Sequence, residues 1–312
     1  MRGKIYITPR SITKNKPTVL KKLEDAGFDL IYAPSGEQPT VSQQMSIIPD
    51  CVAYLAGAEK ISRKIMENAP KLRIISRNGV GVENIDLDAA KELGIIIKTT
   101  PGENSRGVAE LAIALIFAAV RSIPLSDRNI KMGKWNRKTA FELRDKTLGI
   151  IGCGNIGKHV ATMALGIGMI VLAYDLCPDE LFHPSNRFQY CTLEDLISKS
   201  DIITLHCPPS QNPVIGQNQL NSMKSGVILV NTARAGVVDA QEILDALNSE
   251  TLMCYATDVY QTEPPKIDAL IQHERCICTP HIGGYTQESI TRAVDCAVNN
   301  ILDEFSNNKG ST

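Results

Sequence analysis

The sequence predicts an α/β protein made of two domains, each a doubly wound parallel sheet. Its 312 residues exceed the usual length of a single domain. Short apolar runs rich in β-branched residues alternate with helical patterns, and strands that alternate with helices are typical of parallel sheets. Five such runs precede residue 100 and six follow it: KIYI, DLIYA, CVAYLA, RIIS and GIIIKT, then LGIIG, MIVLAYD, DIITLHC, GVILVNT, MCYATDV and CICTP.

The boundary between the domains is expected at residues 99–102, where a strand ends in Thr-Thr-Pro-Gly, which breaks regular structure. A mostly apolar helix is predicted over residues 105–120, with Asn104 as its N-cap. Because a helix that is apolar all round is buried, we expect it between the domains or at a subunit interface.

Composition and charge exclude several classes of protein. Hydrophobic residues make up 43% and charged residues 21%, which is typical of a folded globular protein and not of a disordered one. A formal net charge of -1 without a basic block argues against a nucleic-acid partner. The longest apolar run, residues 111–120, is about half the roughly 20 residues of a membrane span, and residues 5–7 are too short for a secretory signal. We therefore expect no membrane partner and a cytoplasmic location.

The nine cysteines are scattered and include no C-x-x-C pair, which is typical of reduced, mostly buried thiols. Cys276 and Cys278 alternate in a predicted strand, so both side chains are expected on the same side, where they could share a metal. A structural zinc site needs four ligands and no second ligand pair is present, so we predict no metal site.

A glycine-rich loop gives the sharpest local signal. A predicted strand is followed by Gly152-Cys-Gly154-Asn-Ile-Gly157, a helix, and a second strand that ends at Asp175. Gly152 permits a tight turn, Gly154 lets the backbone approach a pyrophosphate, and Gly157 allows the helix and strand to pack closely. The helix N-terminus attracts the anion, and Asp175 is placed to bind the adenosine ribose. This context predicts a Rossmann domain that binds NAD, because a carboxylate would repel the 2′-phosphate of NADP.

Three further residues follow predicted strands and form a candidate catalytic set. Arg234, Glu263 and His281 each lie just beyond a strand, and ligands of open α/β sheets bind at the carboxyl ends of strands. The planar guanidinium of Arg234 suits a substrate carboxylate, and His281 can exchange a proton near neutral pH. Glu263 would orient the imidazole and favour its charged form. Taken singly, each residue is more often structural, and the three could be unrelated surface residues.

Six motifs, the glycine loop among them, resemble the D-2-hydroxyacid dehydrogenase family over essentially the whole chain. They are RNGVGVENIDL, VAELAIAL, GCGNIG, NTARAG, DVYQTEPP and TPHIGGYT. The resemblance implies hydride transfer between NAD(H) and C2 of a small 2-hydroxy or 2-keto acid. It also implies that Arg234 binds the substrate and that Glu263 pairs with His281, the acid/base.

The resemblance further implies a domain organisation and additional contacts. Residues 1–100 with 285–312 would form a flavodoxin-like substrate-binding domain, into which the NAD-binding domain of residues 101–284 is inserted. The chain would be a homodimer. Further expected cofactor contacts are Asn155, Ile156, Cys207, Pro208, Thr232, Ala233, Asp258 and Gly284, and expected substrate contacts are Arg77, Gly79, Val80 and Gly81.

Within the family the chain is most similar to short phosphoglycerate dehydrogenases, with one departure. Those enzymes carry Arg-Ser at the end of the third strand, whereas this chain has Ala56-Gly57, which removes a charged contact for a substrate phosphate. Arg10, Ser11, Lys60 or Arg77 could compensate. A hydroxypyruvate or glyoxylate reductase is therefore the first alternative, and an NAD-sensing corepressor that binds peptides is an alternative of another class.

Overall fold

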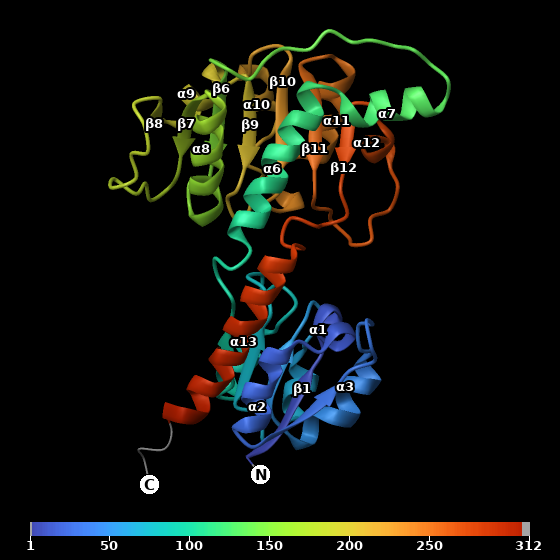
Figure 1. Cartoon of the computed structure of the whole chain (residues 1–312), viewed down its shortest axis with the longest axis vertical. Coiled ribbons are helices and arrows are strands. Elements are labelled where there is room, and N and C mark those ends of the chain that lie inside the picture. Colours follow the sequence, from blue (N-terminus) through green and yellow to red (C-terminus); the bar gives the residue numbers. More distant parts are fainter. Residues whose placement is uncertain (1, 308–312) are drawn as a thin grey trace. The chain divides into compact units, whose positions relative to one another are not determined.

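The computed structural model of the chain describes residues 2–307 and divides into two compact units. One unit comprises the chain up to Asn104 and again from Gln287, and the other is Ser105–Thr286. The boundaries expected from the sequence were after residues 100 and 284. Each unit contains one parallel sheet, of five and of seven strands, so the predicted fold class is confirmed (Figure 1).

The first unit has a five-stranded sheet in the order β2-β1-β3-β4-β5, which is the flavodoxin-like order. All its strand pairs are parallel. Its strands are β1 (Gly3–Ile7), β2 (Phe28–Tyr32), β3 (Cys51–Ala56), β4 (Ile74–Arg77) and β5 (Ile96–Lys98). Its helices are α1 (Arg10–Asn15), η1 (Thr18–Leu20), α2 (Lys21–Asp25), α3 (Val41–Ile47), η2 (Ile48–Asp50), α4 (Arg63–Glu67), α5 (Leu87–Glu92) and α13 (Gln287–Asn307).

Alternation along β1 explains the two cores of this unit. Ile5 and Ile7 face one side of the sheet, where they join Val294, Ala297 and other apolar residues of α13. Tyr6 faces the other side, in the core that contains residues of α4 and α5. Both faces of the sheet are therefore buried at β1, which is why Ile5, Tyr6 and Ile7 form a continuous apolar run.

The second unit has a seven-stranded sheet in the order β12-β11-β10-β9-β6-β7-β8, which is the Rossmann order extended by one strand. Its strands are β6 (Thr147–Ile151), β7 (Ile170–Tyr174), β8 (Phe188–Tyr190), β9 (Ile202–Leu205), β10 (Val227–Asn231), β11 (Leu252–Thr257) and β12 (Cys276–Cys278). Its helices are α6 (Ser105–Val120), α7 (Ile123–Lys131), α8 (Asn155–Ile167), α9 (Leu193–Lys199), α10 (Gln217–Ser222), η3 (Ala235–Val237), α11 (Ala240–Asn248) and α12 (Ala269–Gln272).

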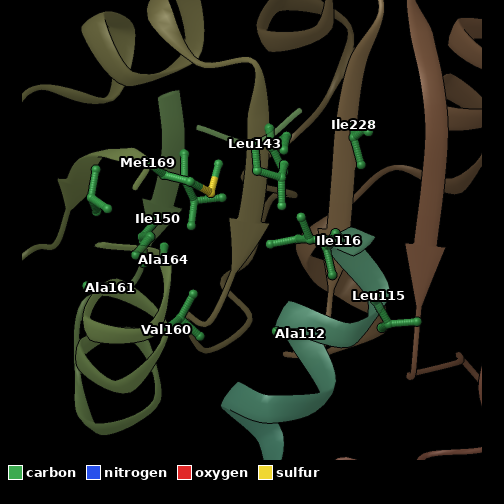
Figure 2. Packing of buried hydrophobic residues seen from close by; sticks show 14 of the residues in the cluster. Ala112, Leu115, Ile116, Leu143, Ile150, Val160, Ala161, Ala164, Met169 and Ile228 are labelled. Atoms are coloured by element: carbon green, nitrogen blue, oxygen red, sulfur yellow. The ribbon is translucent and has the colours of Figure 1, made fainter. Parts of the chain in front are cut away.

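One strand differs from expectation. Strand β8 was not predicted, because its three residues, with Gln189 in the middle, form no apolar run. The buried side of helix α6 is part of the core of the second unit, and its expected place between the domains or at a subunit interface stays a prediction. Figure 2 shows Ala112 and Ile116 of α6 in the same cluster as Val160 of α8 and Ile228 of β10.

Among the described residues, no single helix has both the length and the apolar character needed to cross a membrane. Helices α6 and α7 meet that test only when they are joined, and the pair is bent by 59°.

The close contact of α8 with the glycine loop gives a prediction about stability. A Cβ added at Gly157 would lie 2.2 Å from the carbonyl oxygen of Gly152, whereas a Cβ at Gly166, on the same helix, would meet nothing within 4 Å. We expect Gly157→Ala to lower the free energy of unfolding by about 1–3 kcal/mol through overpacking. Gly166→Ala should leave it unchanged or raise it by up to about 1 kcal/mol. Urea unfolding of both variants measures this, and equal stabilities would contradict the close packing.

Candidate active site

Five loops leave the carboxyl edge of the seven-stranded sheet. They follow β6, β9, β10, β11 and β12, which are consecutive in the sheet and pair in parallel. Because the carboxyl ends of parallel strands lie at one edge, segments that are distant in the sequence are gathered there. These loops begin with residues 152–154, 206–208, 232–234, 258–263 and 279–284.

His281 and Glu263 form a pair at this edge. The imidazole Nδ1 of His281 lies 2.8 Å from both carboxylate oxygens of Glu263, and both side chains are about half exposed. The backbone N–H of Tyr260 also donates to Oε1 of Glu263, at 3.3 Å. With Nδ1 bound to the carboxylate, Nε2 is the ring nitrogen available to exchange a proton with a ligand.

Asp258 holds the loop that carries His281. Its side chain is buried, and Oδ1 accepts from the hydroxyl of Thr279 at 2.6 Å and from the N–H of Ile282 at 2.8 Å. Oδ2 accepts from the N–H of Gly283 at 2.8 Å. The expected contact of Asp258 with the nicotinamide amide stays a prediction. What the structure adds is that this carboxylate already binds both ends of the His281 loop.

Tyr260 and Thr279 also belong to this arrangement, although sequence reasoning did not single them out. The hydroxyl of Tyr260 donates to the carbonyl oxygen of Thr279 at 2.8 Å, and the N–H of His281 donates to the same oxygen at 3.0 Å. His281 has a φ of 52°, in the left-handed region that few non-glycine residues adopt. The loop is therefore held in a specific conformation by bonds on both of its sides.

Arg234 lies at the end of β10, where Asn231 shapes the chain. Asn231 is fully buried, its Oδ1 accepts from the N–H of Ala233 at 3.0 Å, and its Nδ2 donates to the carbonyl oxygen of Arg234 at 2.9 Å. The guanidinium of Arg234 donates to the carbonyl oxygen of Ala233 at 2.8 Å, and the residue is half-buried. Asn231 could have been found from the sequence because it is the polar residue that ends an otherwise apolar strand.

His206, after β9, is a neutral neighbour of this site. Its Nε2 lies 2.9 Å from the hydroxyl of Thr204, and its Nδ1 lies 3.3 Å from that of Thr232. Burial lowers the pKa of His206 to about 3, so the ring carries no charge at neutral pH. Next to it, burial raises the pKa of the Cys207 thiol to about 11, while Pro208 is exposed. Neither His206 nor Cys207 is suited to proton transfer.

The glycine loop has the shape that a bound pyrophosphate requires. A Cβ at Gly152, whose φ is 92°, would lie 2.6 Å from the backbone N of Cys207, so only glycine fits this turn. A Cβ at Gly154 would meet nothing within 4 Å, which leaves the backbone accessible to a ligand. Helix α8 begins at Asn155, followed by Ile156, and no side chain caps this end. Its first N–H groups thus fit an anion.

Asp175 lies at the end of β7, beside this loop. Its Oδ2 accepts from the N–H of Cys153 at 2.7 Å, and its Oδ1 accepts from the N–H of Cys177 at 2.9 Å. The carboxylate is therefore oriented by the glycine loop itself. A carboxylate has about four acceptor positions, so it can still accept from a ribose hydroxyl.

The predicted substrate contacts lie in the first unit, after β4. Gly79 has a φ of 149°, and a Cβ there would lie 2.1 Å from Nη1 of Arg77. That guanidinium donates to the carbonyl oxygen of Asn78. Val80 is exposed and Gly81 is half-buried. In the second unit Gly284 is half-buried directly after the His281 loop.

Within residues 2–307, no group of three or more His, Cys, Asp or Glu side chains is placed to hold a metal ion.

Comparisons with known proteins agree with this geometry. Residues 113–283 match the family model described as D-isomer specific 2-hydroxyacid dehydrogenase, NAD binding domain. Hydroxypyruvate reductase of Thermotoga maritima is 38% identical over 269 residues, which are 84% of this chain and 87% of that protein. D-3-phosphoglycerate dehydrogenase of Methanocaldococcus jannaschii is 39% identical over 76% of this chain, which spans 46% of that protein. The crystal structure of a glyoxylate reductase from Paecilomyes thermophila superposes with a TM-score of 0.85 at 26% identity, covering 99% of this chain and 96% of that one.

The strand order, the open glycine loop and the carboxylate of Asp175 define an α/β protein of the NAD-binding dehydrogenase class. The family model and the relatives then show the family: the chain belongs to the D-isomer specific 2-hydroxyacid dehydrogenases. The predicted family and its NAD-binding domain are thereby confirmed. The chain spans about half the length of the phosphoglycerate dehydrogenases that it matches.

The position of Asp175 gives a prediction about cofactor preference. Asp175→Ala removes the carboxylate that would bind the ribose 2′-hydroxyl and repel a 2′-phosphate. Since hydrogen bonds to charged groups are worth about 1.5–3 kcal/mol, we expect kcat/KM with NADH to fall about tenfold to a hundredfold relative to NADPH. Asp195→Ala, which removes an exposed carboxylate paired with Lys199, is the matched control. If the preference between the two cofactors stayed unchanged in Asp175→Ala, residues other than Asp175 would recognise the ribose, and the prediction would be wrong.

Proposed function

We propose that this chain transfers a hydride between NAD(H) and C2 of a small D-2-hydroxy or 2-keto acid. The observation that carries this proposal is the contact of 2.8 Å between Nδ1 of His281 and each carboxylate oxygen of Glu263, at the sheet edge that also bears Arg234. An imidazole held by a carboxylate and a guanidinium at the same sheet edge are the two groups that reduction of a 2-keto acid needs.

In the proposed reaction, Arg234 binds the substrate carboxylate, which its planar guanidinium can hold with two hydrogen bonds. His281 donates a proton from Nε2 to the keto oxygen during reduction and takes it back during oxidation. Glu263 accepts from Nδ1–H and keeps the ring oriented. Asp258 and Tyr260 act through the loop that they hold, and are positioning residues.

The residues of the second unit fit an NAD molecule, because the glycine loop is open at Gly154 and α8 begins without a side-chain cap. When bound, NAD(H) supplies or accepts the hydride. The residues proposed to hold it are Gly152, Gly154, Asn155, Ile156, Gly157, Asp175, Cys207, Pro208, Thr232, Ala233, Asp258 and Gly284. Arg77 and the backbone of Gly79, Val80 and Gly81 are proposed to bind substrate.

For the substrate, the end of β3 favours an unphosphorylated acid such as hydroxypyruvate or glyoxylate. Ala56 is fully buried, and a Cβ at Gly57 would lie 2.7 Å from Oε2 of Glu59. The buried Glu59 accepts from the N–H of Gly57 at 2.9 Å and from the hydroxyl of Thr8. A phosphate at this strand end would meet a carboxylate instead of the arginine of phosphoglycerate enzymes.

Phosphoglycerate is the second candidate substrate, because two relatives named D-3-phosphoglycerate dehydrogenase are 39% and 40% identical to this chain. Acting on it would place the chain in serine biosynthesis.

A homodimer in the cytoplasm completes the proposal. Helix α7 has no buried residue, and apolar side chains on it and in the segment after it are exposed, including Ile130, Met132 and Trp135. Such a patch is typical of a protein interface. The cysteines of the described residues are free, as expected in a reducing compartment.

The proposal is tested by following NADH absorbance with phosphohydroxypyruvate, hydroxypyruvate, glyoxylate and pyruvate. We expect the highest kcat/KM for hydroxypyruvate or glyoxylate, and a preference for phosphohydroxypyruvate would select the second candidate. With the best substrate, His281→Ala should lower kcat by about 10²- to 10⁴-fold, the usual contribution of a general acid/base.

The matched control is His159→Ala, which removes an exposed histidine of α8 and should leave kcat unchanged. No turnover of any of the four acids, or a His281→Ala variant as active as the control, would contradict the proposed function.

A further inference from the structure

Two thiols meet on strand β12, close to the proposed active site but outside its machinery. The Sγ atoms of Cys276 and Cys278 are 3.6 Å apart, so the expected placement of both side chains on one side of the strand is confirmed. Cys278 is exposed and Cys276 is half-buried. A reagent in solution can therefore reach one sulfur while the other lies in contact with it.

Strand β12 is the edge of the sheet and is weakly held. It pairs with β11 alone, through three residues, and has no partner on its other side among the described strands. An edge strand this short can change its backbone conformation at the cost of few hydrogen bonds. A covalent bond between the two thiols is therefore compatible with the rest of the sheet.

The two thiols differ in reactivity. The hydrogen bond from Cys276 lowers the pKa of Cys278 to about 7, which favours its thiolate at neutral pH. The same contact raises the pKa of Cys276, which keeps its proton. Burial raises the pKa of Cys254 to about 12 and that of Cys51 to about 11, which makes those thiols inert. Cys278 is thus the nucleophile of the pair. Cys276 is the thiol that can attack Cys278 once its sulfur has been oxidised.

We propose that Cys276 and Cys278 form a redox-sensitive dithiol, which a hydroperoxide converts to a reversible intramolecular disulfide that lowers turnover. The Cys278 thiolate attacks the peroxide, the O–O bond breaks, and a sulfenic acid and an alcohol or water are formed. The Cys276 sulfur then attacks the Cys278 sulfur, the S–O bond breaks, and a second water leaves. Two thiols are oxidised, one peroxide is reduced, and exchange with an external dithiol reverses the bond.

The spacing of the two residues explains why the bond would be reversible. Residues i and i+2 of a strand have Cα atoms about 6.4–6.8 Å apart, from a rise of about 3.2–3.4 Å per residue. Disulfides usually join Cα atoms about 4.4–6.8 Å apart, so this pair lies at the upper limit. Strand β12 must shorten to form the bond, and the resulting strain favours reduction.

Shortening β12 would act on the His281 loop, a consequence that rests on the proposed function. Thr279 follows Cys278 directly, and its N–H donates to the carbonyl oxygen of Thr257 at 3.0 Å. Its side chain donates to Asp258, and its carbonyl oxygen accepts from Tyr260 and from the N–H of His281. A displacement of Thr279 therefore loosens the contacts that orient His281. Since a misplacement of about 1 Å can cost about a hundredfold in rate, we expect turnover to fall about tenfold or more.

To test the proposal, the full chain is treated with hydrogen peroxide, its remaining thiols are blocked with N-ethylmaleimide, and the protein is then digested with trypsin. Cys276 and Cys278 lie in one tryptic peptide, residues 276–292, which follows Arg275 and ends at Arg292. We expect this peptide to lose the mass of two hydrogens and to take up no maleimide, while turnover falls about tenfold or more. Dithiothreitol should restore both the thiols and the turnover.

The variants Cys276→Ser and Cys278→Ser should keep the basal turnover and lose its reversible sensitivity to peroxide. Cys296→Ser, which removes a half-buried thiol of α13, should behave as the parent does. A peptide that keeps both thiols, or gains oxygen without losing the two hydrogens, overturns the proposal, as does a disulfide that leaves turnover unchanged. The mass of the peptide does not depend on activity, so a chain inactive on every 2-keto acid can still form the disulfide.

Discussion

The carboxylate of Asp258 is the interaction on which the proposed active site depends. It is buried at the end of β11 and accepts three hydrogen bonds of 2.6 to 2.8 Å from the segment that follows β12. A buried carboxylate must be hydrogen-bonded, because leaving it without partners would cost several kcal/mol. The segment 279–283 is therefore bound to the neighbouring strand, and this holds His281 in a left-handed conformation beside Glu263.

The seven-stranded sheet of the second unit places the other groups of the proposed site at the same edge as Asp258. The parallel sheet gathers the glycine loop, Arg234 and the His281 loop at the same ends of its strands. Two titratable groups beside them are kept uncharged: burial lowers the pKa of His206 to about 3 and raises that of Cys207 to about 11. This leaves Arg234, Glu263 and His281 as the groups proposed to bind the substrate and to exchange a proton.

Sequence alone could predict the fold and the family, because both depend on patterns that are local or follow the chain. The apolar runs identify eleven of the twelve strands, and the glycine loop with Asp175 identifies the cofactor domain. It could not predict the roles of Asn231 and Tyr260, because their partners are loops that only the tertiary structure brings together. For the same reason Asp258 was expected only as a cofactor contact. An apolar pattern predicts that α6 is buried but does not say which residues cover it, and the structure shows residues of α8 and β10 in the same core.

Amide hydrogen exchange of Asp258→Asn tests the central claim most directly. Asparagine keeps the size of the side chain, but its NH₂ group cannot accept the hydrogen bond that Gly283 donates to Oδ2. If Asp258 holds the His281 loop, protection of the amides of Ile282 and Gly283 should fall about tenfold to a hundredfold, while that of strand β10 stays at the parent level. Equal protection of these two amides in the variant and the parent would contradict the account.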